Sequence, residues 1–208
     1  ATLWHRINAT ANFFHGLGVG KDVVVAFALP NLPQTHLVIW GGQAAGIVFA
    51  INPLLEPATI AELLKAGEAK ALVTLAPLPG VDLWPRRQAA LAEVPTLQHV
   101  VLVDPRPQAG PATSANSAAD GEGRVTVHDF TTGVAAQPGD RLLSQRVIAP
   151  DDLSSFFCTG GTTGSPKIAM RTHANEVANA WSVGQGIGEG IGPGKTLFCG
   201  LPMFHVNA

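Results

Sequence analysis

The sequence predicts an α/β fold, with a layered and mainly parallel sheet flanked by helices. Apolar, β-favouring runs alternate with segments of helical periodicity along the first hundred residues. The run at residues 23–29 is continuously apolar, which is typical of a strand covered on both faces. A helix-length segment separates each run from the next, so consecutive strands need crossover connections and lie parallel.

The composition is that of a core-forming globular protein. Of the 208 residues, 46% are hydrophobic and 13% charged, which argues against disorder. The net charge of −2 and the lack of any basic cluster beyond Arg86-Arg87 argue against nucleic-acid binding. Residues 37–51 are the most apolar, but fall short of the ~20 residues that span a bilayer. Cys158 and Cys199 are expected to be buried, reduced thiols, and no secretory signal is visible, so we expect a cytoplasmic protein without a transmembrane segment.

The first hundred residues divide into alternating helices and strands. We expect helices over residues 3–14, 33–46, 57–66 and 85–92. We expect strands over residues 23–29, 47–51, 71–75 and 99–103. Asn31 is predicted to cap the second helix, with Pro33 in its first turn. Ile60, Leu63 and Leu64 are expected to face inward from the third helix.

The second half contains a predicted exposed loop and a hairpin. Residues 104–124 are rich in Pro, Gly, Ala and Ser and lack periodicity, which is typical of a long exposed loop. Beyond it we expect three strands, at residues 125–127, 153–158 and 168–171. The last two are expected to pair around a glycine-rich stretch. Thr172 is predicted to cap a helix on which Val177, Ala180 and Trp181 share a face.

The stretch at residues 159–167 has the composition of a phosphate-binding loop. Gly160, Gly161 and Gly164 let backbone N–H groups converge on an anion with no Cβ in the way. Four hydroxyl donors lie among them, those of Thr159, Thr162, Thr163 and Ser165. Lys167 adds a positive charge. A flexible surface turn is the alternative, because these residue types are common in loops, but the run of hydroxyls followed by a lysine favours the phosphate interpretation.

This stretch is not the P-loop of ATPases. That motif needs Gly directly before the Lys and Ser or Thr directly after it, where this sequence has Pro166 and Ile168. Residues 194–196, Gly-Lys-Thr, also resemble a nucleotide motif. The glycine required five positions earlier is Glu189, however, and a strand-like segment follows. We interpret residues 194–196 as part of a turn.

Two segments carry a family resemblance. Residues 159–167 resemble the threonine- and glycine-rich signature of adenylate-forming enzymes, the superfamily of acyl-CoA synthetases, aryl-CoA ligases, peptide-synthetase adenylation domains and luciferases. Residues 201–205, Leu-Pro-Met-Phe-His, resemble the family's Pro-x-Phe-His segment at the acyl pocket. Weaker similarities occur at residues 28–31, 45–53 and 172–175. Within the superfamily the chain is most similar to bacterial acyl-CoA synthetases.

The resemblance implies an incomplete part of an acyl-CoA-synthetase-like N-terminal domain. The family's later segments, which bind adenine, Mg²⁺ and ribose, have no counterpart here, nor does the C-terminal domain with its catalytic lysine. We expect residues 21–189 to form the main α/β subdomain. Residues 1–20 and about 190–208 are expected to belong to a second subdomain.

The resemblance also implies an AMP-forming acid–thiol ligase, with a place in fatty acid metabolism. In such enzymes a carboxylate attacks the α-phosphorus of ATP, usually with Mg²⁺, and the acyl-adenylate is then transferred to coenzyme A. The resemblance assigns the pyrophosphate end of ATP to residues 159–165 and to Lys167. It assigns the acyl site to His205, and catalytic roles to Lys167 and His205. A surface lysine and a core histidine are the respective alternatives, and the remaining histidines form no metal-ligand cluster.

Alternative functions stay open at this point. The chain could be a non-catalytic module that binds a nucleotide or phosphate, or a structural fragment of an enzyme. It could also belong to an adenylation domain that loads a carrier protein instead of coenzyme A. Under the ligase interpretation, residues 1–208 alone are expected to be inactive.

Overall fold

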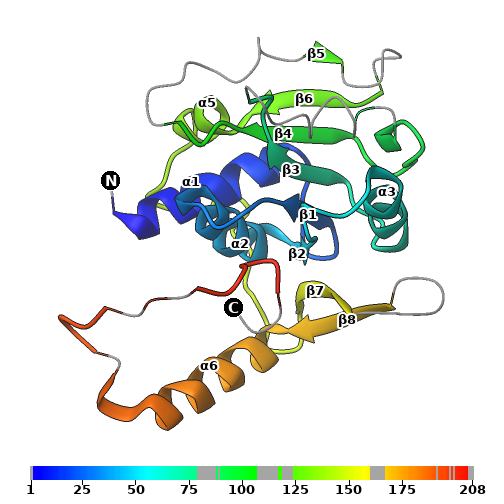
Figure 1. The fold of residues 1–208 in the computed structure, drawn as a ribbon. Helices are drawn as coiled ribbons and strands as arrows, with labels where there is room; N and C mark the ends of the chain where they lie inside the picture. The colour runs from blue at the N-terminus through cyan, green and yellow to red at the C-terminus, as the bar shows by residue number, and fades with distance from the viewer. Residues whose placement is uncertain are drawn as a thin grey trace.

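An eight-stranded sheet organises the part of the chain that the computed structural model describes (Figure 1). The described residues are 2–78, 88, 90–106, 117–118, 124–159, 167–190, 192–196, 198 and 200–205. The strand order is β5-β6-β4-β3-β1-β2-β7-β8. The six inner strands run parallel, and both edge strands pair antiparallel with their neighbours. The predicted mainly parallel α/β sheet is therefore confirmed.

The bounds of the strands lie close to the predicted ones. The inner strands are β1 (Val24–Ala28), β2 (Ile47–Ala50), β3 (Ala71–Leu75), β4 (His99–Val103), β6 (Thr126–Asp129) and β7 (Leu153–Thr159). The edge strands are β5 (Ser117–Ala118) and β8 (Lys167–Thr172). Strand β5 falls within the predicted 104–124 loop, of which residues 107–116 and 119–123 lie outside the described residues.

The helices also agree with the sequence in most places. They are α1 (Leu3–Gly16), α2 (Pro33–Ala45), α3 (Pro57–Ala66), α5 (Phe130–Ala135) and α6 (His173–Ile187), with a 3-10 turn at Gly188–Gly190. The sequence did not predict α5, a short helix that Asp129 caps by accepting from the N–H of Thr132 at 2.8 Å. Of the predicted helix at residues 85–92, residues 85–87 and 89 lie outside the described residues, and residues 88, 90 and 91 are helical. None of the described helices has the length and hydropathy needed to cross a membrane.

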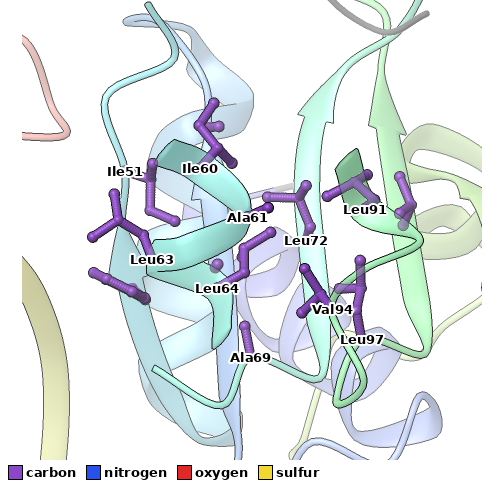
Figure 2. Close-up of a cluster of buried hydrophobic side chains, with 14 of the residues drawn as sticks. Ile51, Ile60, Ala61, Leu63, Leu64, Ala69, Leu72, Leu91, Val94 and Leu97 are labelled. Atoms are coloured by element: carbon purple, nitrogen blue, oxygen red, sulfur yellow. The ribbon is translucent and has the colours of Figure 1, made fainter. Parts of the chain in front are cut away.

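Helices cover the sheet on both faces, because successive side chains of a strand point to opposite sides. Along β1, Ala26 packs with one hydrophobic cluster, whereas Val25 and Phe27 pack with the other. Figure 2 shows the first cluster, in which Leu63 and Leu64 of α3 lie against the sheet as predicted. The second cluster includes side chains of α1, α2 and α5. This two-sided burial explains the uninterrupted apolar run of β1.

Helix α1 packs against α2 and contributes Phe13 and Phe14 to the second cluster. Its buried Asn12 also donates to the carbonyl oxygens of Pro138 and Arg141, at 2.7 and 2.9 Å. The helix therefore fixes the segment that precedes β7. The assignment of residues 1–20 and 190–208 to a second subdomain remains a prediction.

The predicted burial of the cysteine at the end of β7 was wrong. Cys158 is exposed and not buried, and Cys199 lies outside the described residues. Cys158 is exposed because the pairing of β7 with β2 ends at Phe157, so the last residues of β7 extend past the covered sheet.

Helix α6 begins as predicted but is not buried. The capping box of Thr172 and Asn175 is present, as the predicted cap requires. Yet Trp181, on the predicted shared face, is exposed, and α6 buries none of its described residues.

A buried carboxylate anchors the opposite end of β7 from Cys158. Asp152 pairs with Lys21 at 2.7 Å and with Arg146 at 3.3 Å, and its backbone carbonyl accepts from the N–H of His173 at 3.0 Å. Arg146 also donates to the carbonyl of Gly46 at 3.4 Å, at the turn between α2 and β2. The ion pair with Lys21, together with hydrogen bonds from the Ala149 N–H and from Arg146, lowers the pKa of Asp152 to about 2. Asp152 thus joins the start of β7 to the segment before β1, to the segment at Arg146 and to the first residue of α6.

The lowered pKa predicts a specific loss of stability in acid. A carboxyl group whose pKa falls from 3.8 to about 2 on folding stabilises the folded state above pH 3.8, and this stabilisation is lost as the pH falls toward 2. Asp152→Asn should therefore lower the melting temperature at pH 7, and by progressively less between pH 4 and pH 3. Thermal denaturation of both proteins across this range checks the prediction. A difference in melting temperature that stays constant down to pH 3 would contradict it.

Candidate functional site

The candidate site lies at the C-terminal edge of the sheet, which is the side where the carboxyl ends of the parallel strands lie. Strands β1, β2 and β7 are adjacent and parallel, so the segments that follow them emerge at the same edge. In open α/β sheets this edge is the usual place for ligands. The predicted phosphate loop follows β7 directly, and Asn31 lies three residues after the end of β1. Strands β1 and β7 are two strand spacings apart, which corresponds to roughly 10 Å.

The β7–β8 hairpin brings the two ends of the predicted phosphate loop together. Thr159 pairs with Lys167 in the strand register, and the Thr159 hydroxyl donates to the Lys167 carbonyl at 3.3 Å. Both residues are exposed. The residues between them lie outside the described part of the chain: Gly160, Gly161, Thr162, Thr163, Gly164, Ser165 and Pro166. The structure therefore places both ends of this loop at the carboxyl end of β7.

Polar contacts with α6 hold the base of this hairpin. The Ser155 hydroxyl donates to the Glu176 carboxylate at 2.5 Å, and Arg171 pairs with the same carboxylate at 2.7 Å. The Arg171 guanidinium also lies over the ring of Phe157, 5.3 Å from its centroid. Glu176 of α6 thus binds one residue from each strand. This contact could not be predicted from the sequence, because its members are neighbours only once the strands pair.

Asn31 links the end of β1 to the second predicted motif. The prediction that Asn31 caps α2 was wrong: the N-cap position is Leu32, and no side chain makes a cap hydrogen bond there. Instead, the Asn31 amide donates to the carbonyl of Leu201 at 2.8 Å and accepts from the N–H of Met203 at 2.7 Å. Figure 1 shows this C-terminal segment, in red, returning to lie beside α2. A carboxamide has one donor and one acceptor arm, so it can bind two backbone groups at once.

His205 lies on the surface of this C-terminal segment. Its N–H donates to the Pro202 carbonyl at 2.8 Å, which closes a turn. Phe204 is half-buried and packs against the hydrophobic cluster shared by α1, α2 and the sheet. The His205 side chain itself is exposed, which disfavours a core role. The sequence-predicted groups Lys167 and His205 are therefore both accessible at the candidate edge.

The described residues include no group of three or more His, Cys, Asp or Glu side chains that could hold a metal ion. They do include a histidine pair that the sequence analysis missed, with His99 Nδ1 3.2 Å from His128 Nε2. Burial lowers the pKa of both side chains, and the charge of Lys70 lowers that of His99 further. The pair lies on β4 and β6, away from β1 and β7, and is not part of the candidate site.

Comparison with protein families gives one match over the whole chain. The matching family is described as "AMP-binding enzyme", and the match spans residues 1–208. A marinolic acid–CoA ligase of Pseudoalteromonas sp. (strain SANK 73390) is 35% identical over 201 residues, which cover 95% of this chain and 28% of the relative. A long-chain-fatty-acid–CoA ligase of Salmonella typhimurium is 32% identical over 204 residues, covering 93% of this chain and 35% of the relative. The chain thus spans about a third of the length of these curated relatives.

Two solved structures share the fold. A long-chain-fatty-acid–CoA ligase from Archaeoglobus fulgidus superposes with a TM-score of 0.73 at 21% identity, over 97% of this chain and 34% of the other. An acetoacetyl-CoA synthetase from Streptomyces lividans gives a TM-score of 0.75 at 19% identity, over 98% of this chain and 30% of the other. The arrangement of strands and helices described above is therefore one that experimentally solved CoA ligases also contain.

Proposed function

The chain belongs to the AMP-binding enzyme family, and from this premise we propose that it forms the ATP-phosphate-binding part of an acyl-CoA synthetase. In this proposal the intact enzyme converts a carboxylic acid into an acyl-adenylate and then into a thioester of coenzyme A. The observation that carries the proposal is the position of the two motifs. The ends of the glycine-rich loop lie where β7 ends, and Asn31, which follows the parallel strand β1 two strand positions away, binds the backbone of the His205 segment.

Residues 159–167 are proposed to bind the leaving pyrophosphate. Negative charge grows on the β- and γ-phosphates as the carboxylate oxygen bonds to the α-phosphorus and the bond to pyrophosphate breaks. Backbone N–H groups, the threonine and serine hydroxyls and the Lys167 ammonium would stabilise that charge without having to reorganise. The hairpin supports this role because its pairing holds Thr159 and Lys167 side by side.

His205 and Phe204 are proposed to contribute to the acyl site. Phe204 is half-buried against the second hydrophobic cluster, and His205 is exposed beside it, so one residue can form a wall and the other can orient a carboxylate. ATP would enter as its magnesium complex. The described residues include no group of three or more His, Cys, Asp or Glu side chains that could hold the ion by themselves. Coenzyme A is favoured over a carrier protein because the curated relatives named above are CoA ligases.

Pyrophosphate release by the intact protein tests this function. With ATP, Mg²⁺ and coenzyme A, a panel of acetate, octanoate, palmitate and benzoate should include an acid that raises pyrophosphate release well above the acid-free rate. AMP should accumulate in equal amount, and a thioester should form only when coenzyme A is present. ATP binding without release for any acid in the panel would instead favour the non-catalytic module. Residues 1–208 alone, assayed in parallel, are expected to release no pyrophosphate.

A further inference from the structure

We propose that Asn31 is a positioning residue, whose side-chain amide holds the backbone at Leu201 and Met203 so that His205 faces the candidate site. The contact joins residues 170 and 172 positions apart, at hydrogen-bond distances of 2.8 and 2.7 Å. The two hydrogen bonds are observed in the structure. The effect of these bonds on catalysis, through the position of His205, rests on the proposed function.

The backbone around Asn31 is fixed by its own neighbours. Leu29 is fully buried at the end of β1. The hydroxyl of Thr35, also fully buried, donates to the Pro30 carbonyl at 2.7 Å, and its N–H donates to the Leu32 carbonyl at 3.0 Å. The turn is thus held at both ends, by the sheet core and by the first turn of α2. Asn31 therefore projects from a rigid base, which is what a positioning residue requires.

The contact extends to His205 through a short, closed segment. The backbone N–H of Met203 donates a hydrogen bond to the Asn31 side chain, and the next residue, Phe204, packs against the second hydrophobic cluster. The Pro202 carbonyl accepts from the His205 N–H at 2.8 Å. Losing the Asn31 bonds would remove two hydrogen bonds that connect this segment to the end of β1. A shift of His205 by about 1 Å is enough to slow a reaction roughly 100-fold.

Asn52 provides a matched comparison within the same chain. It follows β2 as Asn31 follows β1, although it is half-buried where Asn31 is exposed. Among the described residues its side chain hydrogen-bonds locally, accepting from the N–H of Leu54, two residues away, at 2.9 Å. Asn52→Ala therefore removes an asparagine at the same edge of the sheet without touching the 201–205 segment. This variant controls for general effects of altering the edge.

The test compares Asn31→Ala, Asn31→Asp and Asn52→Ala in the intact protein, by hydrogen exchange and by kinetics. Asn31→Ala should speed exchange of the Met203 amide and lower kcat/KM for the best acid of the panel about 10- to 100-fold. The KM for ATP should stay within about twofold, because the phosphate loop is held separately by β7 and β8. Asn31→Asp keeps an acceptor for Met203 but loses the donor to Leu201, so its effects should be intermediate.

Three outcomes overturn the proposal. One is an unchanged exchange rate at Met203 in Asn31→Ala. The second is an equal loss of kcat/KM in Asn52→Ala, which would indicate a general effect of the edge. The third is an equal rise in the KM values for acid and ATP, as a merely structural role would produce. Inactivity of the wild-type protein toward every acid would count against the proposed function, whereas the exchange rate at Met203 reports on the contact independently.

Discussion

Lys167→Ala is expected to slow acyl-adenylate formation by the intact protein about 100-fold, with little change in melting temperature. Lys167 is exposed at the end of the β7–β8 hairpin, so its side chain contributes little to the packed core. Its proposed role is to neutralise charge on the leaving pyrophosphate, and removal of one preorganised charge-stabilising group typically costs 10²- to 10³-fold in kcat. Acid-dependent pyrophosphate release and thermal denaturation, measured on the same preparation, check the two parts of this prediction.

Lys195→Ala is the matched control for this variant. Lys195 is also an exposed lysine in a glycine-rich segment, and its N–H donates to the Gly192 carbonyl at 3.0 Å in the turn that the sequence predicted there. Its replacement should leave pyrophosphate release within about twofold of wild type. If Lys167→Ala keeps wild-type rates, or if both variants lose activity equally, Lys167 does not have the assigned role.

Phe49→Ala is expected to lower the free energy of unfolding by about 3–5 kcal/mol, the usual cost of truncating a buried aromatic side chain. Phe49 is fully buried in β2, with its ring edge-to-face to Phe156 of β7 at a centroid distance of 6.0 Å. It also closely approaches the backbone of Gly67, where an added Cβ would lie 2.7 Å from the ring. Since whole domains are stable by only about 5–15 kcal/mol, this loss is a large fraction of the total.

Leu54→Ala shows whether the effect of Phe49→Ala depends on burial. Leu54 lies just beyond the same strand but is 79% exposed, so its truncation should change the free energy of unfolding by less than about 0.5 kcal/mol. Urea denaturation of the two variants and the wild type measures the difference. Similar denaturation midpoints for all three proteins would mean that the buried Phe49 ring does not stabilise the first hydrophobic cluster.

The local pattern of the sequence was sufficient to predict most of the elements. Continuous apolar runs gave the buried parallel strands, and helical spacing gave α1 and α3. Thr172 was correctly predicted to cap α6, because the partner in its capping box, Asn175, is only three residues away. Predictions of this kind succeed because the interacting groups are close in sequence and the period of apolar residues reflects burial directly.

Predictions that depended on distant partners were the ones that failed. Asn31 has the residue type and position of a helix cap, but its partners lie 170 and 172 residues away, and no local signal distinguishes the two roles. Cys158 was expected to be buried because its neighbours are apolar, yet burial there depends on where the pairing with β2 ends. The His99–His128 contact likewise exists only because β4 and β6 are adjacent strands.

The sequence by itself determined the fold class, the family and the residue types of the phosphate loop, because periodicity and short motifs are local properties of the chain. Only the tertiary structure decided which motifs share an edge of the sheet. The strand order places β1 beside β2 and β2 beside β7, although more than a hundred residues separate β2 from β7 along the chain. That order brings Asn31 and the ends of the glycine-rich loop to the same edge, because parallel strands of one sheet all end on the same side. The hydrogen bonds from Asn31 to residues 201 and 203 then hold the segment of His205 there.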